Sequence, residues 1–316
     1  MTGGAGAGGV LLLSHRACLG HDMGEGHPEC PGRLRAVLRA LEAQAFCGLA
    51  RAEAPAATRE QLARVHPTDY VDAILSVRPG PDEWVALDGD TRMSSGSAEA
   101  ALRAAGAGVA AVDAVLGGEC LRAFCAVRPP GHHCEPRRPM GFCLFSSVAV
   151  AARHAVAAHG LARVAVVDFD VHHGNGTQAV FERDAGVFFA SSHQMPLYPG
   201  TGWPRERGVG NVVNVALPPG SGPEAFREAW SARILPALEA FAPELLLISA
   251  GFDAHARDPL AQLRLGEDDF AWVTHALCDV ARRVCGGRVV STLEGGYDLD
   301  ALARSTAAHV RALMEG

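Results

Sequence analysis

Lysine is absent from this sequence, so every basic residue is an arginine. The 28 arginines are outnumbered by 35 Asp and Glu residues, which gives a formal net charge of −7. A protein that binds nucleic acid directly normally carries a basic surface, and this composition argues against that class of partner. An acidic surface instead suits a cationic substrate.

The sequence also lacks CxxC pairs. Its nine cysteines are an odd number, and Cys125, Cys143 and Cys278 lie in apolar runs. Isolated cysteines in such runs are typical of buried free thiols rather than disulfides. We therefore predict a reducing compartment and a cytoplasmic protein.

Long apolar runs are missing as well. Val10–Leu13 is too short to span a membrane or to form the core of a signal peptide, and Met1–Gly9 is Gly-rich and lacks a charged start. We expect residues 1–9 to be a flexible N-terminus and predict no membrane contact. Residues 10–316 then form one large domain, since no linker or internal repeat divides them.

What is present fits an ordinary globular protein, with 48% hydrophobic and 20% charged residues. Short β-branched runs recur between Ala-rich segments, which indicates an α/β fold with a parallel sheet covered by helices on both faces. The predicted strands are Val10–Leu13, Arg122–Val127, Val164–Asp168, Val187–Ala190, Leu245–Ser249 and Arg288–Leu293. The predicted helices are Pro31–Gln44, Ser97–Leu116, Ser146–Ala158, Pro223–Phe241, Glu267–Cys285 and Leu299–Met314.

Polar residues follow two of these strands at once. Asp168, Asp170 and His172 come off the end of one strand, and on a period of two they point the same way. Asp253 follows another strand, and ligands of such sheets bind beyond the carboxyl ends of the strands. Each Asp alone is more often a helix cap. Together, Asp170, His172 and Asp253 form a three-ligand set with an open position, as catalytic zinc requires.

Two further segments add groups for acid and base chemistry. Arg128–His133 places His132 and His133 on a rigid turn after a third strand, where Asp168 can orient an imidazole that serves as a general base. Solvent exposure or helix capping is the alternative for a His pair. After a fourth strand, Gly295 and Gly296 let the backbone approach the site before Tyr297, whose phenol could stabilise an oxyanion. Tyr297 alone could equally be a turn residue.

These segments together resemble the zinc-dependent histone deacetylase family, which also contains bacterial acetylpolyamine amidohydrolases and acetoin-utilisation proteins. The resemblance begins at His15 and His27–Glu29 with Arg33 and ends at Glu294–Tyr297. Four motifs occur in the family's order: Arg128–His133, Gly141–Cys143, Asp168–Gln178 and Gly251–Leu260. The resemblance implies the arginase-deacetylase fold, a largely parallel sheet of about eight strands.

The resemblance also implies roles for the residues of the site. It assigns one Zn²⁺ to Asp170, His172 and Asp253. His133 would be the general base and later the acid, while His132, with Asp168 behind it, would be mainly an electrostatic partner. Tyr297 would polarise the scissile carbonyl. A structural K⁺ would lie against Asp168, Asp170 and His172 with Ser191 and Ser192 nearby.

Other positions match the family's substrate tunnel. Phe142, next to Gly141, and Tyr198 match the two aromatic walls, although the second is commonly Phe; both could instead pack in the core. Asp90 falls where the family binds the substrate backbone. Leu260 stands where a polyamine-selective relative has an acidic residue.

We therefore expect an amidohydrolase that removes acetyl or other acyl groups from lysine side chains of a peptide or protein. A deacetylase of acetylpolyamines or other small acylated amines is the alternative. Asn175, where class I members carry Asp, resembles the class II branch and leaves His133 without a carboxylate partner. A non-catalytic acyl-lysine binding protein and a binuclear manganese hydrolase fit His133 and Tyr297 less well. A homodimer or homotetramer is compatible with the family.

Overall fold

Eight parallel strands form the central sheet of the computed structural model, which describes residues 9–316. In sheet order the strands are β2 (Ala50–Glu53), β1 (Val10–Ser14), β5 (Arg122–Cys125), β10 (Val289–Leu293), β9 (Leu245–Ala250), β6 (Val164–Asp168), β7 (Val187–Gln194) and β8 (Val212–Leu217). The mainly parallel sheet of about eight strands is thus confirmed. The expectation for residues 1–9 falls almost wholly outside the described residues.

The central strands are continuous apolar runs because helices cover both of their faces. Every residue of β9 and β6 is buried, and a strand with no solvent face needs no polar alternation. The two edge strands were not predicted. β2 reads Ala-Arg-Ala-Glu and is largely exposed, while β8 is only half buried and has Asn214 at its centre.

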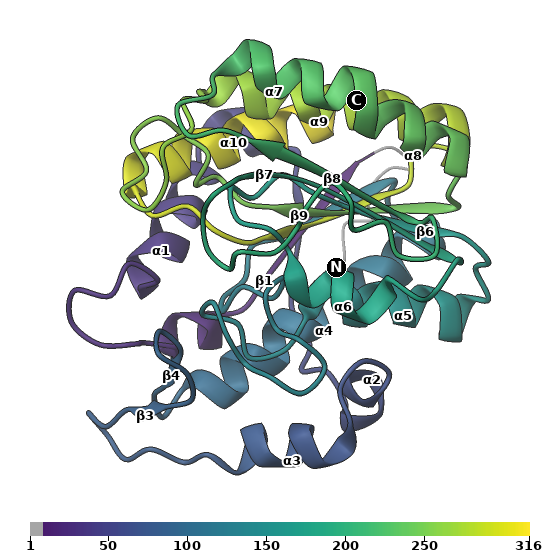
Figure 1. Cartoon of the computed structure of the whole chain (residues 1–316). Coiled ribbons are helices and arrows are strands. Elements are labelled where there is room, and N and C mark those ends of the chain that lie inside the picture. The colour runs from purple at the N-terminus through teal and green to yellow at the C-terminus, as the bar shows by residue number, and fades with distance from the viewer. Residues whose placement is uncertain (1–8) are drawn as a thin grey trace.

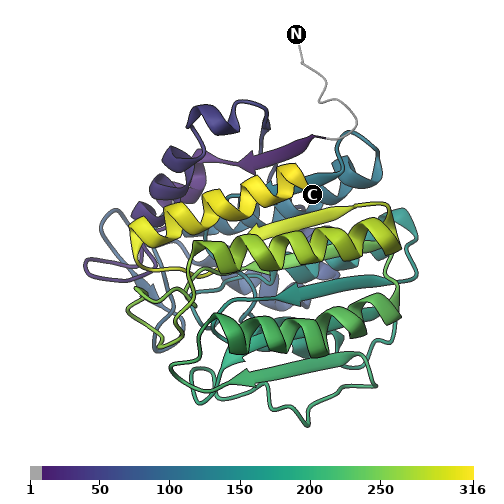
Figure 2. The ribbon, with the colours of Figure 1, turned by 90° about the horizontal axis from the view of Figure 1, so that it is seen from above.

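Helices lie in two layers on the sheet. In Figure 1, helices α7–α10 lie above it and α4–α6 below it, and Figure 2 shows the upper helices running side by side over the strands. The upper layer contains α7 (Pro223–Ala229), α8 (Leu235–Phe241), α9 (Glu267–Cys285) and α10 (Leu299–Glu315), with α1 (Pro31–Ala40) against α10. The lower layer contains α4 (Ser97–Leu116), α5 (Ser147–His159) and α6 (Asn175–Phe181).

One predicted helix is interrupted. Pro223–Phe241 was expected to be a single helix, but a π-helical turn at Trp230–Ile234 separates α7 from α8. Pro236 follows this turn and has no N–H to donate to the carbonyl one helical turn earlier. A wider turn accommodates the missing donor.

A small subdomain-like layer lies beneath α4 in Figure 1. It contains α2 (Arg59–Ala63), α3 (Thr68–Ser76) and the antiparallel pair β3 (Val85–Ala86) and β4 (Arg92–Met93). Tyr70, Val71 and Phe145 belong to the hydrophobic cluster that holds this layer to α4 and α5. The elements were not predicted because they are short. Asp90 lies in the turn that joins β3 to β4.

The topology brings four strand ends together. The chain passes from β5 to β6 across a gap in the sheet that β9 and β10 fill later, so the order is β5-β10-β9-β6. Because all four strands are parallel, their carboxyl ends meet at one edge. The segments Arg128–His133, Glu294–Tyr297, Gly251–Asp253 and Asp168–His172 therefore become neighbours.

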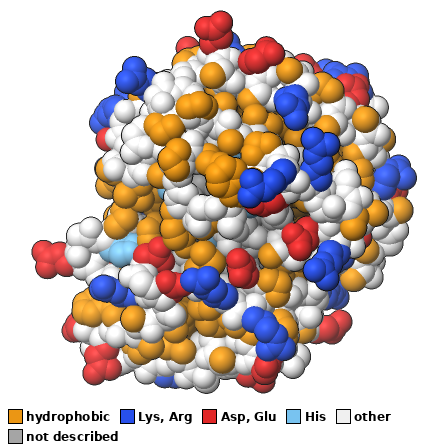
Figure 3. Space-filling view, viewed as in Figure 1, with side chains coloured by type: hydrophobic (Ala, Val, Ile, Leu, Met, Phe, Trp, Pro, Cys, Tyr) orange, Lys and Arg blue, Asp and Glu red, His pale blue; other side chains and the backbone are white. Residues whose placement is uncertain are grey.

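Arginine and acidic side chains are interspersed over the face of the described chain seen in Figure 3. Within residues 9–316, none of the helices combines the length and the apolar character needed to cross a membrane.

Candidate active site

Asp170, His172 and Asp253 meet at the edge where β6 and β9 end. The His172 Nδ1 atom lies 3.1 Å from Asp170 Oδ1 and 3.0 Å from Asp253 Oδ2. All three side chains are buried, and one ligand atom from each lies within 4.8 Å of the others. The structure thus brings the three predicted ligands into one group.

The chain leaves the regular strand at Asp168 but keeps the predicted alternation. Phe169 and Val171 are fully buried in the core, while Asp168, Asp170 and His172 face the site. The Asp170 N–H donates to Asp168 Oδ1 at 3.0 Å, and the His172 N–H donates to Asp170 Oδ1 at 2.9 Å. These bonds hold the residues after the strand in place.

Backbone donors also fix the two carboxylates. The Val171 N–H donates to Asp253 Oδ1 and the Gly295 N–H to Asp170 Oδ2, both at 2.8 Å. A Cβ on Gly295 would overlap the Asp253 carboxylate, and one on Gly251 would overlap that of Asp170. Only glycine lets the backbone come this close.

The charges in this group favour a cation. Burial raises the pKa of Asp253 to about 7, with a further rise from the negative charge of Asp170. Burial opposes ionisation of Asp170 too, but the surrounding imidazoles His132, His172 and His133 hold its pKa low. Buried carboxylates this close repel one another unless a cation lies between them. Two carboxylates, one imidazole and glycine-lined space fit a divalent metal with an open coordination position.

His132 and His133 lie side by side but have different partners. His132 Nδ1 lies 2.9 Å from Asp168 Oδ2. Burial opposes a charge on His132, yet Asp170 and Asp168 raise its pKa well above the ordinary value. His133 Nδ1 instead lies 2.8 Å from Asn175 Oδ1. Burial, with the neighbouring imidazoles His132 and His172, lowers the pKa of His133 well below the ordinary value.

The Asn175 contact defines which nitrogen of His133 is free. The Asn175 Nδ2 group donates to Glu135 Oε1 at 2.9 Å, so its oxygen is the atom that faces His133. An amide oxygen only accepts, and Nδ1 of His133 must therefore carry the proton. Nε2 is left with a lone pair, as a general base requires.

Tyr297 lies on a loop held by buried charged side chains. Arg33 donates from Nε to the Gly296 carbonyl at 2.6 Å, and its guanidinium carbon lies 4.9 Å from the centre of the Tyr297 ring. Glu29 accepts from Arg33 Nη1 at 3.1 Å and also binds Arg128. Burial raises the pKa of Tyr297 well above the ordinary value, with Arg33 opposing the rise. The hydroxyl therefore stays protonated and able to donate.

Two more carboxylates fix the loops of the site. Glu294 Oε2 accepts from the Gly131 N–H at 2.6 Å and from the His132 N–H at 3.2 Å. Asp258 accepts from the Tyr297 N–H at 2.8 Å and from the Leu260 N–H at 2.9 Å. Sequence reasoning did not single out either residue. Their signal, an acid in a motif next to a predicted site residue, cannot be told from a cap.

A pocket of about 220 Å³ opens beside the triad. Its lining is Asp90, His133, Gly141, Phe142, His172, Leu197, Tyr198, Leu260 and Tyr297. Every predicted substrate-binding residue is in this set. Leu197 was missed because an apolar residue in a Pro-rich loop carries no chemical signature.

The two ends of the pocket differ. His133 and His172 are buried, whereas Tyr198 is 38% exposed. Phe142 reaches the pocket from a left-handed backbone position (φ 69°) and packs edge-on against Tyr297, with ring centres 5.9 Å apart. The Phe142 N–H donates to Thr91 Oγ1, whose hydroxyl donates to Asp90 Oδ1 at 2.8 Å. The loop of Asp90 is thereby connected to the aromatic wall.

Of the predicted potassium residues, Asp170 and His172 belong to the triad, Asp168 ends β6, and Ser191 and Ser192 lie on β7. Asp168 and Ser191 are paired in the sheet and both are fully buried. Ser191 Oγ lies 2.9 Å from His193 Nδ1, while Ser192 Oγ accepts from Trp230 Nε1 at 3.0 Å.

Comparisons with known proteins agree with this geometry. Residues 27–313 match the histone deacetylase domain. Histone deacetylase 14, chloroplastic, of Arabidopsis thaliana is 41% identical over 324 residues, which cover 96% of this chain and 76% of that protein. The histone deacetylase-like amidohydrolase of Pseudomonas aeruginosa is 43% identical over 279 residues, with 86% of this chain and 73% of that protein covered.

Two more relatives extend the comparison. The polyamine deacetylase HDAC10 of Homo sapiens is 37% identical over 331 residues, which cover 97% of this chain and 48% of that protein. The crystal structure of the HDA15 HD domain superposes with a TM-score of 0.91 at 34% identity, over 98% of this chain and 89% of that one. The chain therefore belongs to the histone deacetylase family and is a deacetylase of the amidohydrolase type, with a buried Asp-His-Asp group suited to a divalent metal.

Proposed function

We propose that this protein is a zinc-dependent deacylase that removes acetyl or other acyl groups from lysine side chains. The observation that carries the proposal is the pocket, whose buried end is formed by His133 and His172 with Tyr297 beside them. Phe142, Tyr198, Leu197 and Leu260 give it apolar walls. An acylated lysine has an apolar stem and a neutral amide at its end, which suits walls of this kind.

Zn²⁺ would be held by Asp170, His172 and Asp253. In such a site zinc acts as a Lewis acid and lowers the pKa of water.

The chain's own residues supply the remaining chemistry. His133 accepts a proton from the attacking water at Nε2, and later donates it to the nitrogen of the leaving amine. Asn175 keeps His133 in the required tautomer. Asp170 and Asp168 raise the pKa of His132, and its positively charged imidazole stabilises the negative charge that develops on the substrate. Tyr297 donates from its hydroxyl to the acyl oxygen.

The substrate class rests on Leu260. In an acetylpolyamine, the amine nitrogens beyond the amide are positively charged and would favour an acidic residue in the pocket wall. Residue 260 is an apolar leucine. Acetylpolyamines remain the alternative, since one relative is named a polyamine deacetylase. One preparation is assayed with an acetyl-lysine peptide, a longer acyl-lysine peptide, acetylputrescine and acetylspermidine. The proposal expects the highest kcat/KM for a lysine peptide, and a preference for acetylspermidine would overturn it.

Leu260→Glu tests the same point from the other side. A carboxylate at this position should raise kcat/KM for acetylspermidine relative to acetyl-lysine by roughly tenfold, the factor for about 1.4 kcal/mol. Leu260→Gln, which has the same length without the charge, is the matched control and should leave the ratio near that of the native chain. An equal change of this kcat/KM ratio in both variants would show that charge is not the cause.

Two competing functions give different results. A non-catalytic acyl-lysine binding protein would bind the peptide without turnover, and Tyr297→Phe would change nothing in the assay. A binuclear manganese hydrolase would hold two metal ions at the strand ends.

The remaining predictions are more general. We propose that K⁺ lies against Asp168 and Ser191, which predicts that stability depends on K⁺ more than on Na⁺ at equal ionic strength. Three further predictions are untested: the cytoplasmic location, the domain boundary at residue 10, and the homodimer or homotetramer. Gel filtration with light scattering measures the oligomeric state.

A further inference from the structure

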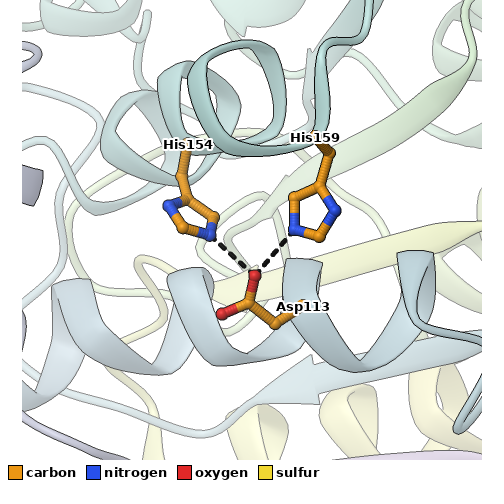
Figure 4. Close-up of side chains that lie close together, drawn as sticks. All are labelled: Asp113, His154 and His159. Atoms are coloured by element: carbon orange, nitrogen blue, oxygen red, sulfur yellow. Dashed lines mark hydrogen bonds and ion pairs between the residues drawn. The ribbon is translucent and has the colours of Figure 1, made fainter.

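Asp113, His154 and His159 form a second cluster of metal-ligating side chains, away from the catalytic pocket. Asp113 lies on α4, while His154 and His159 lie on α5, the neighbouring helix (Figure 4). The Nε2 atoms of both imidazoles lie 2.7 Å from the same oxygen, Asp113 Oδ1. Figure 4 shows both rings pointing from α5 toward this carboxylate.

The cluster lies near the amino end of β6, whereas the catalytic residues lie at the carboxyl ends of the strands. α5 ends at His159, and β6 begins at Val164 a few residues later. The catalytic residues instead lie at the carboxyl ends of β5, β6, β9 and β10. The two groups are thus separated by the length of a strand.

The donors suit a transition metal. Two imidazole nitrogens and one carboxylate oxygen are ligands that Zn²⁺, Ni²⁺ and Cu²⁺ accept, whereas Mg²⁺ and Ca²⁺ prefer oxygen alone. The ligand atoms lie within 4.8 Å of one another. The Asp113 side chain is 53% exposed and that of His159 27% exposed, so an ion can enter from solvent and keep water in its remaining positions.

The Asp113 carboxylate is ionised, as a metal ligand needs to be. Burial alone would raise the pKa of Asp113, but the hydrogen bonds from His154 and His159 lower it below the ordinary value. The ligands come from two helices packed against each other. An ion held there would join α4 to α5.

We propose that Asp113, His154 and His159 bind a divalent transition metal such as Zn²⁺ as a second, surface site that joins α4 to α5. This proposal is independent of the proposed deacylase function.

Arg64 sets the condition for binding. Its Nη1 atom donates to His154 Nδ1 at 2.7 Å, so in the metal-free cluster His154 carries its proton on Nε2 and donates it to Asp113. A metal on Nε2 requires the proton on Nδ1 instead, where it would face a guanidinium donor. Arg64 must therefore move aside when the ion binds, and its removal should favour binding.

Calorimetric titration tests the site. Protein that already holds one tightly bound Zn²⁺ per chain is titrated with Zn²⁺ and, separately, with Mg²⁺. We expect one further equivalent of Zn²⁺, none of Mg²⁺, and a higher Tm with the second equivalent. The absence of a second zinc equivalent would overturn the proposal.

Variants then assign the residues. His159→Gln and Asp113→Asn should weaken the second equivalent by more than about tenfold, because even an outer partner of a ligand contributes roughly that much. His275→Gln is the matched control, since His275 also lies on a helix and pairs with one carboxylate, Glu315, at 3.4 Å. Retention of full affinity in both cluster variants would contradict the assignment, as would an equal loss in the control.

Arg64→Met gives a test in the opposite direction. Loss of the competing donor should tighten binding by about fivefold, the factor for about one hydrogen bond. Weaker binding of the second Zn²⁺ by Arg64→Met would contradict the assignment of His154 Nε2 as a ligand. Circular dichroism of each variant confirms that the fold is retained.

Discussion

His133 is oriented by the side-chain amide of Asn175. This single contact keeps the proton on Nδ1 and leaves a lone pair on Nε2. Asn175 Oδ1 lies 2.8 Å from Nδ1 and is itself held by the bond from Asn175 Nδ2 to Glu135. A carboxylate in the same place would also accept the proton and would make the imidazole more basic. The amide therefore orients His133 without adding negative charge to a site that already holds Asp168, Asp170 and Asp253.

Asn175→Leu should lower kcat for an acetyl-lysine peptide by about 10- to 100-fold, because His133 loses the acceptor that fixes its tautomer. Asn175→Asp keeps an acceptor and should retain most of the activity, with the pH profile moved to higher pH. Steady-state kinetics against pH measures both. An Asn175→Leu variant with native kcat would contradict the role given to this contact.

Residues with a chemical signature were those that could be predicted from the sequence. Asp170, His172 and Asp253 were found because two acids and an imidazole that follow strand ends form, as a group, a set of metal ligands. Leu197 does not have that property, and Arg33, although it is part of the resemblance, was given no role from the sequence. An arginine near the start of a helix and a leucine in a loop occur everywhere, and only the fold brings them to Tyr297 and to the pocket.

At the scale of elements, Asp258 joins the two loops that form one side of the pocket. One of its oxygens accepts from the Leu260 N–H and the other from the Tyr297 N–H. The apolar wall and the proposed oxyanion donor are thereby held by the same carboxylate.

Asp258→Asn should therefore affect turnover more than folding. The amide keeps one acceptor but turns an NH₂ donor toward a backbone N–H, which displaces one loop. We expect kcat to fall by about 10-fold or more with a smaller change in Tm. Kinetics and thermal unfolding measure the two effects, and a loss of stability without a loss of kcat would show a purely structural residue.

His66 joins the small layer of α2 and α3 to α5. Its Nδ1 lies 3.1 Å from the Pro136 carbonyl, which can only accept, and the Ser146 N–H donates to Nε2 at 2.9 Å. Both nitrogens are thus occupied only in the neutral form. Burial lowers the pKa of His66 to about 4.

The sign of the pH effect follows from that shift. The pKa in the folded protein lies below the unfolded value near 6.5, so the stabilisation is complete above pH 6.5. It is lost as the pH falls toward 4, by up to about 3 kcal/mol. Urea unfolding between pH 7 and pH 4 should show a shallower loss for His66→Gln than for the native chain. Parallel curves for the two proteins would contradict the prediction.

Long elements could be predicted from the sequence and short ones could not. The helix Ser97–Leu116 and the helix Glu267–Cys285 have the predicted bounds because Ala-rich or amphipathic periodicity extends over many residues. The edge strand β2 and the short helices α2 and α3 have too few residues for a periodic signal. Contacts with the rest of the fold decide their conformation.

At the scale of the whole molecule, the site depends on strand order. The sequence indicates which segments are strands, and it indicates that polar residues follow them. It contains no local signal that β9 and β10 insert between β5 and β6. That order alone makes neighbours of segments as distant in the chain as His132 and Glu294.

The proposed deacylation depends on a metal ion held by Asp170, His172 and Asp253. The most direct test measures tightly bound zinc and turnover of an acetyl-lysine peptide in the same preparations of the native chain and of Asp253→Asn, after loosely bound metal has been removed. We predict one zinc per chain with turnover in the native protein, and loss of both in the folded variant. Native-like zinc content and turnover in Asp253→Asn would contradict this role of the Asp-His-Asp group. A fully metal-loaded native protein that hydrolyses neither acyl-lysine nor acetylpolyamine would contradict the proposed activity.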